Sequence, residues 1–387
     1  MTQIPKSVLT FLCLAVFAAP PTPSQAASFQ GLGVGFFGPS PGFESSATGV
    51  SADGSVVVGE NRGEAFRWKN SGGMVGLGLF AGQHPTSTAL GVSADGSTIV
   101  GSAVAGFPAP TAQSFQWKSA GGLMGGPALG SGPSSAEGVS ADGSVVVGGS
   151  APGQNTNLQA FRWTMGSGAV GLGTLGGDVS SDAAGVSADG SVVVGTSATV
   201  GGTNHAFRWT ASIGMVGLGV VPGETTSQAL GISADGKVVV GGSGKQAFRW
   251  TAGSGMVGLG ILPGDDSSVA AAVSADGSVV VGSDLRPCSL SPVCPGGGQH
   301  HAMVWDAVHG LRSLQQVLMD DGVNLSAWTL TKATSISADG NTIVGDGLDG
   351  NTPEAWIAVI PEPGTGLLVM GGVLGLGITR RTSRGSG

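Results

Sequence analysis

Seven aspartates recur along this chain, and a ring of carboxylates is the first chemistry that the sequence offers. Each follows Ser-Ala and precedes Gly, at Asp53, Asp95, Asp142, Asp189, Asp235, Asp276 and Asp339. Carboxylates bind cations or transfer protons, but such sites need a second carboxylate at a fixed spacing, and none of the seven has one. An Asp directly before Gly between β-rich segments is typical of a tight hairpin, because Gly accepts positive φ and Asp bonds its own turn backbone. We therefore interpret all seven as structural turn residues.

A second group of potential ligands is formed by Cys288 and Cys294 with the adjacent His300 and His301. The cysteine spacing is longer than zinc knuckles use, and adjacent histidines do not readily share one ion. If the chain is exported, as its first residues indicate, two remaining cysteines favour a disulfide between Cys288 and Cys294. The sequence therefore predicts this disulfide, no metal and no cofactor, with a zinc site as the alternative.

No nucleophile elbow, His-Glu-x-x-His motif, phosphate loop or paired-carboxylate motif occurs in the chain. We therefore expect a protein that is not an enzyme. The alternative is an enzyme that acts on glycans through residues of irregular loops.

The turn residues belong to a repeat, which must position every candidate side chain. The Ser-Ala-Asp-Gly phrase returns at strides of 42, 47, 47, 46, 41 and 63 residues, a period typical of propeller blades. A phrase close to Ala-Phe-Arg-Trp and another close to Val-Gly-Leu-Gly follow it, so each unit contains four strand-like segments. Continuous Val-Val-Val runs indicate strands that are covered on both faces. The sequence predicts an all-β fold, a seven-bladed β-propeller of four-stranded blades.

The two ends of the repeat region predict a closed ring, with an open β-solenoid as the alternative. Phe29–Gly33 is a lone copy of the third phrase, whereas the last unit ends at Trp356 without one. A first strand that completes the last blade would remove two exposed sheet edges. The longest stride contains an insertion at residues 287–332, in which Leu311–Leu318 predicts a short helix. This insertion is our first candidate for a contact surface.

Four arginines stand between the Phe and the Trp of the second phrase, at Arg67, Arg162, Arg208 and Arg249. Alternation along a strand points them away from both aromatic side chains. A partly buried Arg needs a partner. We expect each to pair with the turn Asp of its own blade or of the adjacent blade.

The two ends of the chain carry export signals. Residues 1–26 combine Lys6, an apolar stretch and a small-x-small pattern ending at Ala26, which predicts a signal peptide. Residues 360–387 contain Pro361-Glu362-Pro363, an apolar segment and three arginines, Arg380, Arg381 and Arg384. Arginines beyond a short apolar helix stay cytoplasmic. This end therefore predicts a membrane helix, either a processed tail or a lasting anchor, and residues 27–359 form the repeat body.

The tail resembles the PEP-CTERM sorting signal of exported bacterial proteins, which has the same order of Pro-Glu-Pro, membrane helix and arginine cluster. The repeats are similar to the extracellular HAF repeat family, whose His-Ala-Phe phrase stands in full at His205-Ala206-Phe207. The first resemblance implies that an exosortase-type enzyme processes the protein after the export machinery has moved it, with a link to extracellular polysaccharide production. The second implies an extracellular location without a shared activity.

The repeat body has 12 basic and 23 acidic residues, a net charge of about −11, which argues against a nucleic acid partner. We expect an exported, exosortase-sorted protein of the cell surface or extracellular matrix, whose propeller binds extracellular polysaccharide or another matrix protein. The alternatives are a propeller enzyme acting on glycans and a purely structural matrix component. Fold alone does not separate these functions.

Overall fold

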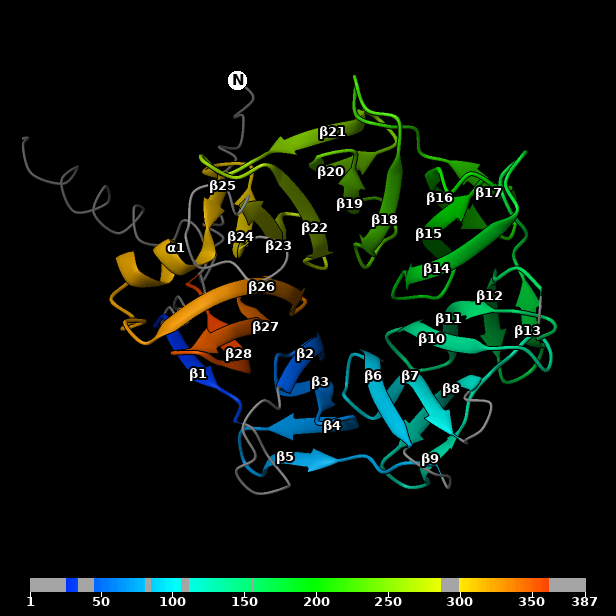
Figure 1. Ribbon diagram of the computed structural model, residues 1–387, viewed down its shortest axis with the longest axis horizontal. Helices are drawn as coiled ribbons and strands as arrows, with labels where there is room; N and C mark the ends of the chain where they lie inside the picture. Colours follow the sequence, from blue (N-terminus) through cyan, green and yellow to red (C-terminus); the bar gives the residue numbers. More distant parts are fainter. Residues whose placement is uncertain are drawn as a thin grey trace, which may run out of the picture. The chain divides into compact units, whose positions relative to one another are not determined.

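The computed structural model describes residues 26–33, 45–80, 85–105, 111–154, 156–286 and 299–361. These residues form seven four-stranded antiparallel sheets arranged as blades around a central axis (Figure 1). The prediction of a seven-bladed propeller is confirmed. Ala26–Pro361 is one compact unit. The predicted leader, the tail beyond Pro361 and the cysteine pair lie outside the described residues.

Within each blade the strands are called A to D from the centre outward, which in blades 1 to 6 is also their order in the chain. Blade 1 contains β2 (Ser45–Val50), β3 (Val56–Asn61), β4 (Glu64–Lys69) and β5 (Gly73–Gly76), and blade 2 contains β6 (Thr86–Val92), β7 (Thr98–Ala105), β8 (Thr111–Lys118) and β9 (Gly122–Gly125). Blade 3 contains β10 (Ser134–Val139), β11 (Val145–Ser150), β12 (Gln159–Thr164) and β13 (Gly168–Gly171), and blade 4 contains β14 (Ser180–Val186), β15 (Val192–Ala198), β16 (Asn204–Thr210) and β17 (Gly214–Gly217). Blade 5 contains β18 (Ser227–Ile232), β19 (Val239–Ser243), β20 (Gln246–Thr251) and β21 (Gly255–Gly260), and blade 6 contains β22 (Ser267–Val273), β23 (Val279–Arg286), β24 (Gln299–Asp306) and β25 (Gly310–Ser313). Blade 7 contains β26 (Trp328–Ile336), β27 (Thr342–Asp349) and β28 (Thr352–Val359), with β1 (Ser28–Gly31) as its outer strand.

The cores between blades are built from the repeated apolar phrases. Val56, Val57 and Val58 of strand B are fully buried, as expected for a strand covered on both faces. The position of the Phe in strand C is also fully buried in every blade. It is occupied by Phe66, Phe115, Phe161, Phe207 and Phe248 in blades 1 to 5, by Met303 in blade 6 and by Trp356 in blade 7. These side chains face the preceding blade and bury apolar area between neighbouring blades.

Each A–B turn is fastened by its own Ser and Asp side chains. In blade 1 the Ser51 hydroxyl donates to Asp53 Oδ1 at 2.6 Å, and the Ser55 N–H donates to the same oxygen at 3.0 Å. The Val56 N–H in turn donates to the Ser51 hydroxyl oxygen at 2.9 Å. Gly54 has φ of +72° and faces the previous blade so closely that an added Cβ would lie 2.5 Å from Thr342 Oγ1. The phrase is therefore a complete turn device, and only Gly fits its fourth position.

The seven turns are joined into a closed ring by backbone hydrogen bonds. The alanine of each turn donates its N–H to the alanine carbonyl of the next blade, through Ala52, Ala94, Ala141, Ala188, Ala234, Ala275 and Ala338, which donates back to Ala52. The first strand closes the ring a second time, since β1 pairs with β28 from Ser28↔Val359 to Gly31↔Trp356. Phe29 on β1 packs against Trp328 and Trp356, with ring centroids 4.9 Å and 6.0 Å away.

The predicted helix exists but begins three residues later than expected. Gly310–Ser313 forms β25, because it pairs with β24 as the outer strand of blade 6. The helix α1 is Leu314–Asp320, and its N-cap Ser313 accepts from the Gln316 N–H. Leu314 and Leu318 are fully buried in the core shared by blades 6 and 7. No helix among the described residues is long and apolar enough to cross a membrane.

Candidate functional site

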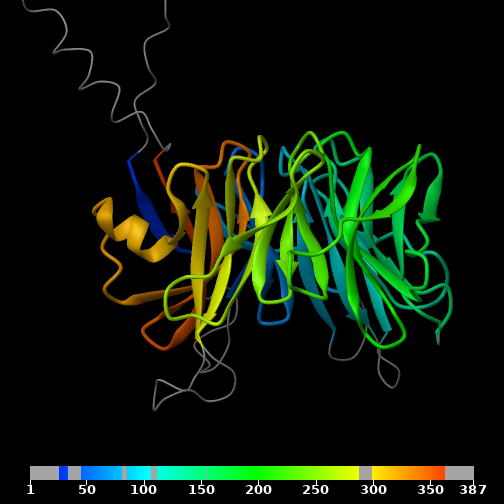
Figure 2. The same ribbon diagram turned by 90° about the horizontal axis from the view of Figure 1, so that it is seen from above.

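The ring has two rims with different construction (Figure 2). One rim, the turn face, consists of the A–B and C–D turns, which repeat with little change. The other rim, the loop face, consists of the B–C and D–A connections, which differ in length and include α1 between β25 and β26. Because binding residues concentrate on irregular connections held by a rigid scaffold, the loop face is the first place to look for a site.

A buried carboxylate organises two surface side chains at the loop face of blade 6. Asp265, in the D–A connection before β22, has a side chain with 0% exposure. It accepts from Arg286 Nε at 2.9 Å and from His301 Nδ1, also at 2.9 Å. The side chains of Arg286 and His301 remain 42% and 24% exposed. Among the described residues, neither the Nη atoms of Arg286 nor Nε2 of His301 has another hydrogen bond partner. Asp265 therefore holds a guanidinium and an imidazole ready for a ligand.

A second carboxyl lies beneath this pair. Asp284 on β23 is fully buried and stands opposite His301 on β24. Its Oδ2 accepts from the Leu262 N–H at 2.5 Å, the role that Ser150, Ser197 and Ser243 play in blades 3 to 5. Its Oδ1 has no partner in the described part of the chain. Burial, with a smaller contribution from the negative charge of Asp265, raises the pKa of Asp284 to about 6.

Two further basic residues lie near this pair, on the other face of the blade 6 sheet toward blade 7. His300 on β24 is half-buried, and Lys332 on the adjacent β26 of blade 7 is exposed. Burial lowers the pKa of His300, and the charges of Lys332 and His301 lower it further. Arg286, His300, His301 and Lys332 are called the basic cluster below. It lies within and beside the 287–332 segment that the sequence indicated as a contact surface, although its four residues lie on the regular strands β23, β24 and β26.

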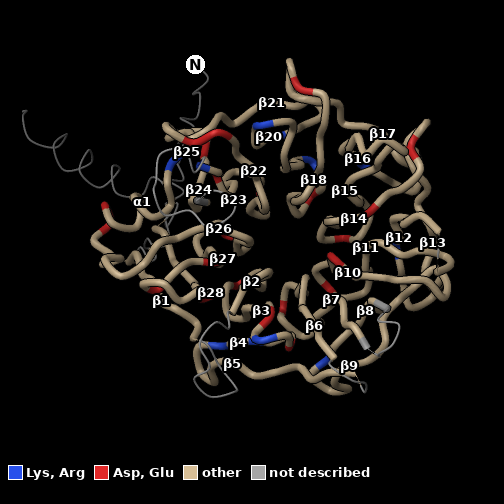
Figure 3. Tube along the Cα trace, viewed as in Figure 1, with Lys and Arg blue, Asp and Glu red and all other residues tan. Residues whose placement is uncertain are grey.

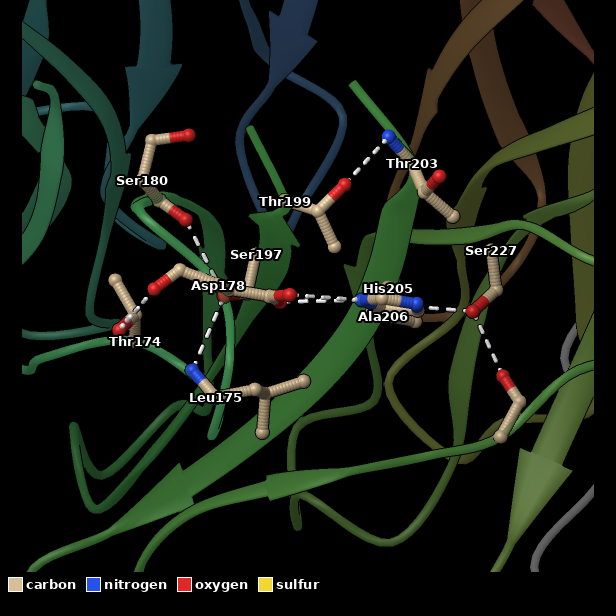
Figure 4. Close-up of polar contacts among 11 residues, drawn as sticks. Thr174, Leu175, Asp178, Ser180, Ser197, Thr199, Thr203, His205, Ala206 and Ser227 are labelled. Atoms are coloured by element: carbon tan, nitrogen blue, oxygen red, sulfur yellow. Dashed lines mark hydrogen bonds and ion pairs between the residues drawn. The ribbon is translucent and has the colours of Figure 1, made fainter. Parts of the chain in front are cut away.

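In two blades the His of the His-Ala-Phe phrase contacts an Asp in the D–A connection that precedes its blade. In blade 4, His205 Nδ1 lies 3.1 Å from Asp178 Oδ2, and Asp178 belongs to the D–A connection before β14 (Figure 4). This matches the pair of His301 with Asp265 in blade 6. In blades 1 and 7 the same position is Glu64 or Glu354, which accepts from a backbone N–H of Gly78 or Gly33. The first residue of the phrase therefore ties strand C to the following or preceding loop.

The arginines of strand C contact the adjacent blade, but the expected acceptor is wrong. Arg162 Nε donates to the Gly190 carbonyl oxygen at 2.9 Å, and Arg249 Nε to that of Gly277 at 3.2 Å. The turn aspartates are already engaged by their own serines, which lower the pKa of Asp189 to about 2. A backbone carbonyl one residue beyond the Asp is the free acceptor within reach. Arg67 instead lies over the ring of Trp117, 5.2 Å from its centroid.

Sequence reasoning missed one pair of carboxyl groups because its members lie on different blades. Glu137 on β10 and Asp182 on β14 belong to neighbouring inner strands. Burial and the nearby Glu137 raise the pKa of Asp182 to about 7, and burial also raises that of Glu137. Asp182 fits against blade 3 only because residue 149 is Gly, whose added Cβ would lie 2.5 Å from Asp182 Oδ1. Both positions are variable in the repeat, so no recurring pattern indicates the pair.

The central cavity offers little chemistry. It measures about 240 Å³ and is lined by the ends of the inner strands, mainly Gly, Ala, Val and Ile. The hydroxyls of Thr48 and Thr334 in its wall donate to the carbonyl oxygens of Ala89 and Ala47, each at 2.7 Å. Figure 3 shows acidic residues placed around this opening. In the described part of the chain, no three His, Cys, Asp or Glu side chains are placed to hold a metal ion.

The structure places the predicted site residues as follows. All seven turn aspartates lie in A–B turns and accept from a serine hydroxyl two residues earlier. Pro361 is the last described residue, so Glu362, Pro363, Arg380, Arg381 and Arg384 of the sorting motif lie outside the described part of the chain, as do Cys288 and Cys294.

No protein-family model and no curated protein matches this chain. Solved structures match its chain path at low identity. TolB from Acinetobacter baumannii is 14% identical over 69% of this chain, with a TM-score of 0.42, and the match covers 64% of that protein's length. A chain of the mitotic checkpoint complex is 14% identical over 92% of this chain and 99% of its own, with a TM-score of 0.49. The β-propeller domain of the Trilobed protease from Pyrococcus furiosus is 8% identical over 70% of this chain and 82% of its own, with a TM-score of 0.46. At these values the likeness carries no information about function.

Proposed function

We propose that this protein is an exported, surface-sorted propeller that binds an acidic extracellular polysaccharide and performs no catalytic step. The observation that carries the proposal is the buried Asp265, which holds Arg286 and His301 at the loop face. A guanidinium matches a carboxylate or sulfate with two parallel hydrogen bonds, and an imidazole adds a further donor.

The charge distribution favours an acidic polymer bound at one place. The body carries about −11 overall, so an anionic chain is repelled from most of its surface. The basic cluster is an exception, because Asp265 beneath it is fully covered and engaged by both donors. Contact between polymer and protein would then be confined to this cluster and would weaken with added salt.

Export and sorting rest on the two chain ends. The leader at residues 1–26 supports export, and the Pro361-Glu362-Pro363 tail supports processing by an exosortase-type enzyme. Mass spectrometry of the exported form tests this part of the proposal. We expect a C-terminus close to residues 361–363, and an exported form that still contains Arg384 would contradict the sorting model.

A glycan array tests the binding function. The probe is residues 27–361, which contain every strand of the closed ring. We expect selective retention on polysaccharides that contain uronic acids or sulfate. Arg286→Gln should lose this retention, whereas Lys237→Gln, at a 79% exposed lysine of the turn face, should keep it. Retention that is absent in the unaltered protein or indifferent to Arg286 would contradict the proposal, and release of sugar fragments would favour a glycan-acting enzyme.

A further inference from the structure

A cavity on the turn face has both an aromatic wall and a cation. It lies between blades 2 and 3, measures about 390 Å³ and is lined by Lys118, Asp142, Trp163 and Met165, among others. Lys118 ends strand C of blade 2, Asp142 is in the A–B turn of blade 3, and Met165 is in the C–D turn of blade 3. This cavity is therefore on the opposite rim from the basic cluster.

The repeat departs from its pattern at residue 116, two residues before Lys118 of the cavity wall. In blades 1, 3, 4 and 5 the second phrase has Arg at this position, and that side chain extends into the gap toward the next blade, whereas blades 6 and 7 have Val304 and Ile357. Arg67 lies over Trp117, Arg249 lies 6.0 Å from the centroid of Trp305, and Arg162 and Arg208 bond to the turn carbonyls of Gly190 and Gly236. Blade 2 has Gln116 instead, so no guanidinium covers Trp163 or reaches the turn of blade 3.

The side chain of Gln116 has a buried hydrogen bond donor without a partner. The residue is 8% exposed, and its Nε2 has no partner in the described part of the chain. Buried polar atoms without partners are rare in folded proteins and indicate a ligand or water where one fits. A donor without a partner therefore remains on strand C of blade 2, at the position where blades 1, 3, 4 and 5 have an arginine that contacts the next blade.

The lining chemistry suits an acidic sugar. Trp163 is half-buried and Met165 is 80% exposed, so they supply an apolar wall and rim for the C–H face of a sugar ring. Lys118 supplies a positive charge for a carboxylate. Asp142 is ionised above pH 3, because hydrogen bonds from Ser140 and Ser144 lower its pKa to about 2. Its Oδ1 is used within the turn, and Oδ2, which has no partner among the described residues, can accept from a sugar hydroxyl.

We infer that the cavity between blades 2 and 3 is a second binding site, for a single uronic acid residue of a polysaccharide. The inference rests on the proposed function and extends it, since the basic cluster lies on the other rim. A propeller with one site on each rim can hold two polymer chains and cross-link them, and two weak sites then act together through their linkage.

The test uses variants that restore the residues of the repeat, so that folding is retained. Gln116→Arg refills the gap, and Lys118→Thr introduces the residue that blades 3 to 5 have, at Thr164, Thr210 and Thr251. The probe is an oligogalacturonate, and the readout is the NMR shift of the Trp163 indole N–H, assigned by Trp163→Phe. We expect binding to the unaltered protein, at least tenfold weaker binding in both variants, and unchanged binding in Arg286→Gln.

The outcomes separate this inference from the proposed function. If polysaccharide is retained but the oligogalacturonate leaves the Trp163 signal unchanged, or binds Gln116→Arg equally well, the second site is wrong and the loop-face function stands. If neither the polymer nor the oligogalacturonate binds, both are wrong. As an independent check, the unaltered protein should cross-link a dilute acidic polysaccharide into larger particles in light scattering, and Gln116→Arg should not.

Discussion

The backbone N–H of Ala338 donates a hydrogen bond to the carbonyl oxygen of Ala52 at 2.9 Å, although the two residues lie at opposite ends of the repeat region. This bond closes a cycle of seven equivalent bonds, one for each blade, and the pairing of β1 with β28 closes the ring a second time. The closed scaffold fixes the two rims, and the candidate sites depend on that rigidity.

Closure through β1 predicts a cost for Phe29→Ala. The ring of Phe29 contacts Trp328 and Trp356, and its removal should lower the free energy of unfolding by about 2 to 3 kcal/mol, somewhat less than for a fully buried Phe. Urea unfolding measures this loss. Val200→Ala, at an 86% exposed position, is the control and should change stability by less than about 0.5 kcal/mol. Equal stability of both variants would mean that β1 does not hold the last blade.

The turn aspartates predict a loss of stability in acid. Hydrogen bonds from serines lower the pKa of Asp142 from 3.8 to about 2 and those of Asp95 and Asp189 similarly. For Asp235 the main cause of the same lowering is the hydrogen bonds from Lys237. A carboxyl with a lowered pKa in the folded state stabilises fully above its unfolded pKa, and this contribution is lost as the pH falls. The melting temperature should therefore decrease between about pH 4 and pH 2. Asp142→Asn should make this decrease shallower, and an unchanged slope would contradict the turn role.

The pair of Glu137 and Asp182 predicts the opposite dependence at higher pH. The pKa of Asp182 is raised from 3.8 to about 7, so the folded state holds its proton more tightly and stability falls as the pH rises from about 4 to 7. Asp182→Asn should remove part of this fall and make the protein more stable than the unaltered chain at pH 8. Asp284 titrates alike in both proteins, so the difference between their curves isolates Asp182. Identical curves would show that the pKa of Asp182 is not raised in the folded protein.

Because Arg162 bonds to the Gly190 carbonyl, we predict that its contribution to stability does not depend on the neighbouring turn residue Asp189. In a double-mutant cycle of Arg162→Met and Asp189→Asn, each change should destabilise the protein, and the two effects should add within about 0.5 kcal/mol. The measurement is urea unfolding of the four proteins. A coupling energy above about 1 kcal/mol would contradict this prediction and support the ion pair between Arg162 and Asp189 that the sequence suggested.

The repeat explains why the fold could be predicted from the sequence and the candidate sites only in part. Ser51, Asp53 and Gly54 form a turn through local bonds, so seven copies of their phrase predict seven turns and seven blades. The cluster of Asp265, Arg286 and His301 forms because a D–A loop folds over strands B and C, a contact that occurs in this form in one blade. Sequence reasoning named the segment 287–332, which contains His301, but it did not indicate Asp265 or Arg286. Gln116 was visible as a departure from the repeat, but its meaning depends on how the arginines of blades 1, 3, 4 and 5 contact the next blade.

The pairing of Glu137 with Asp182 was beyond sequence reasoning for a different reason. The two residues occupy different positions of the repeat. Glu137 stands directly before the Gly-Val pair that recurs in several blades, and Asp182 stands directly before an Ala. They interact because adjacent inner strands approach closely at the axis, which depends on packing between blades. Packing also explains why α1 begins later than predicted. Residues 311–313 have helical spacing, but they pair with β24 as part of a strand.

The most direct test of binding without catalysis is to incubate residues 27–361 with a labelled acidic polysaccharide and to follow both partners. Size-exclusion chromatography measures how much polymer the protein retains, and the same run reports the length of the polymer. We predict that the polymer is retained at low salt, released at high salt and unchanged in length, with retention lost in Arg286→Gln. No retention, or a polymer that becomes shorter with time, would contradict the account.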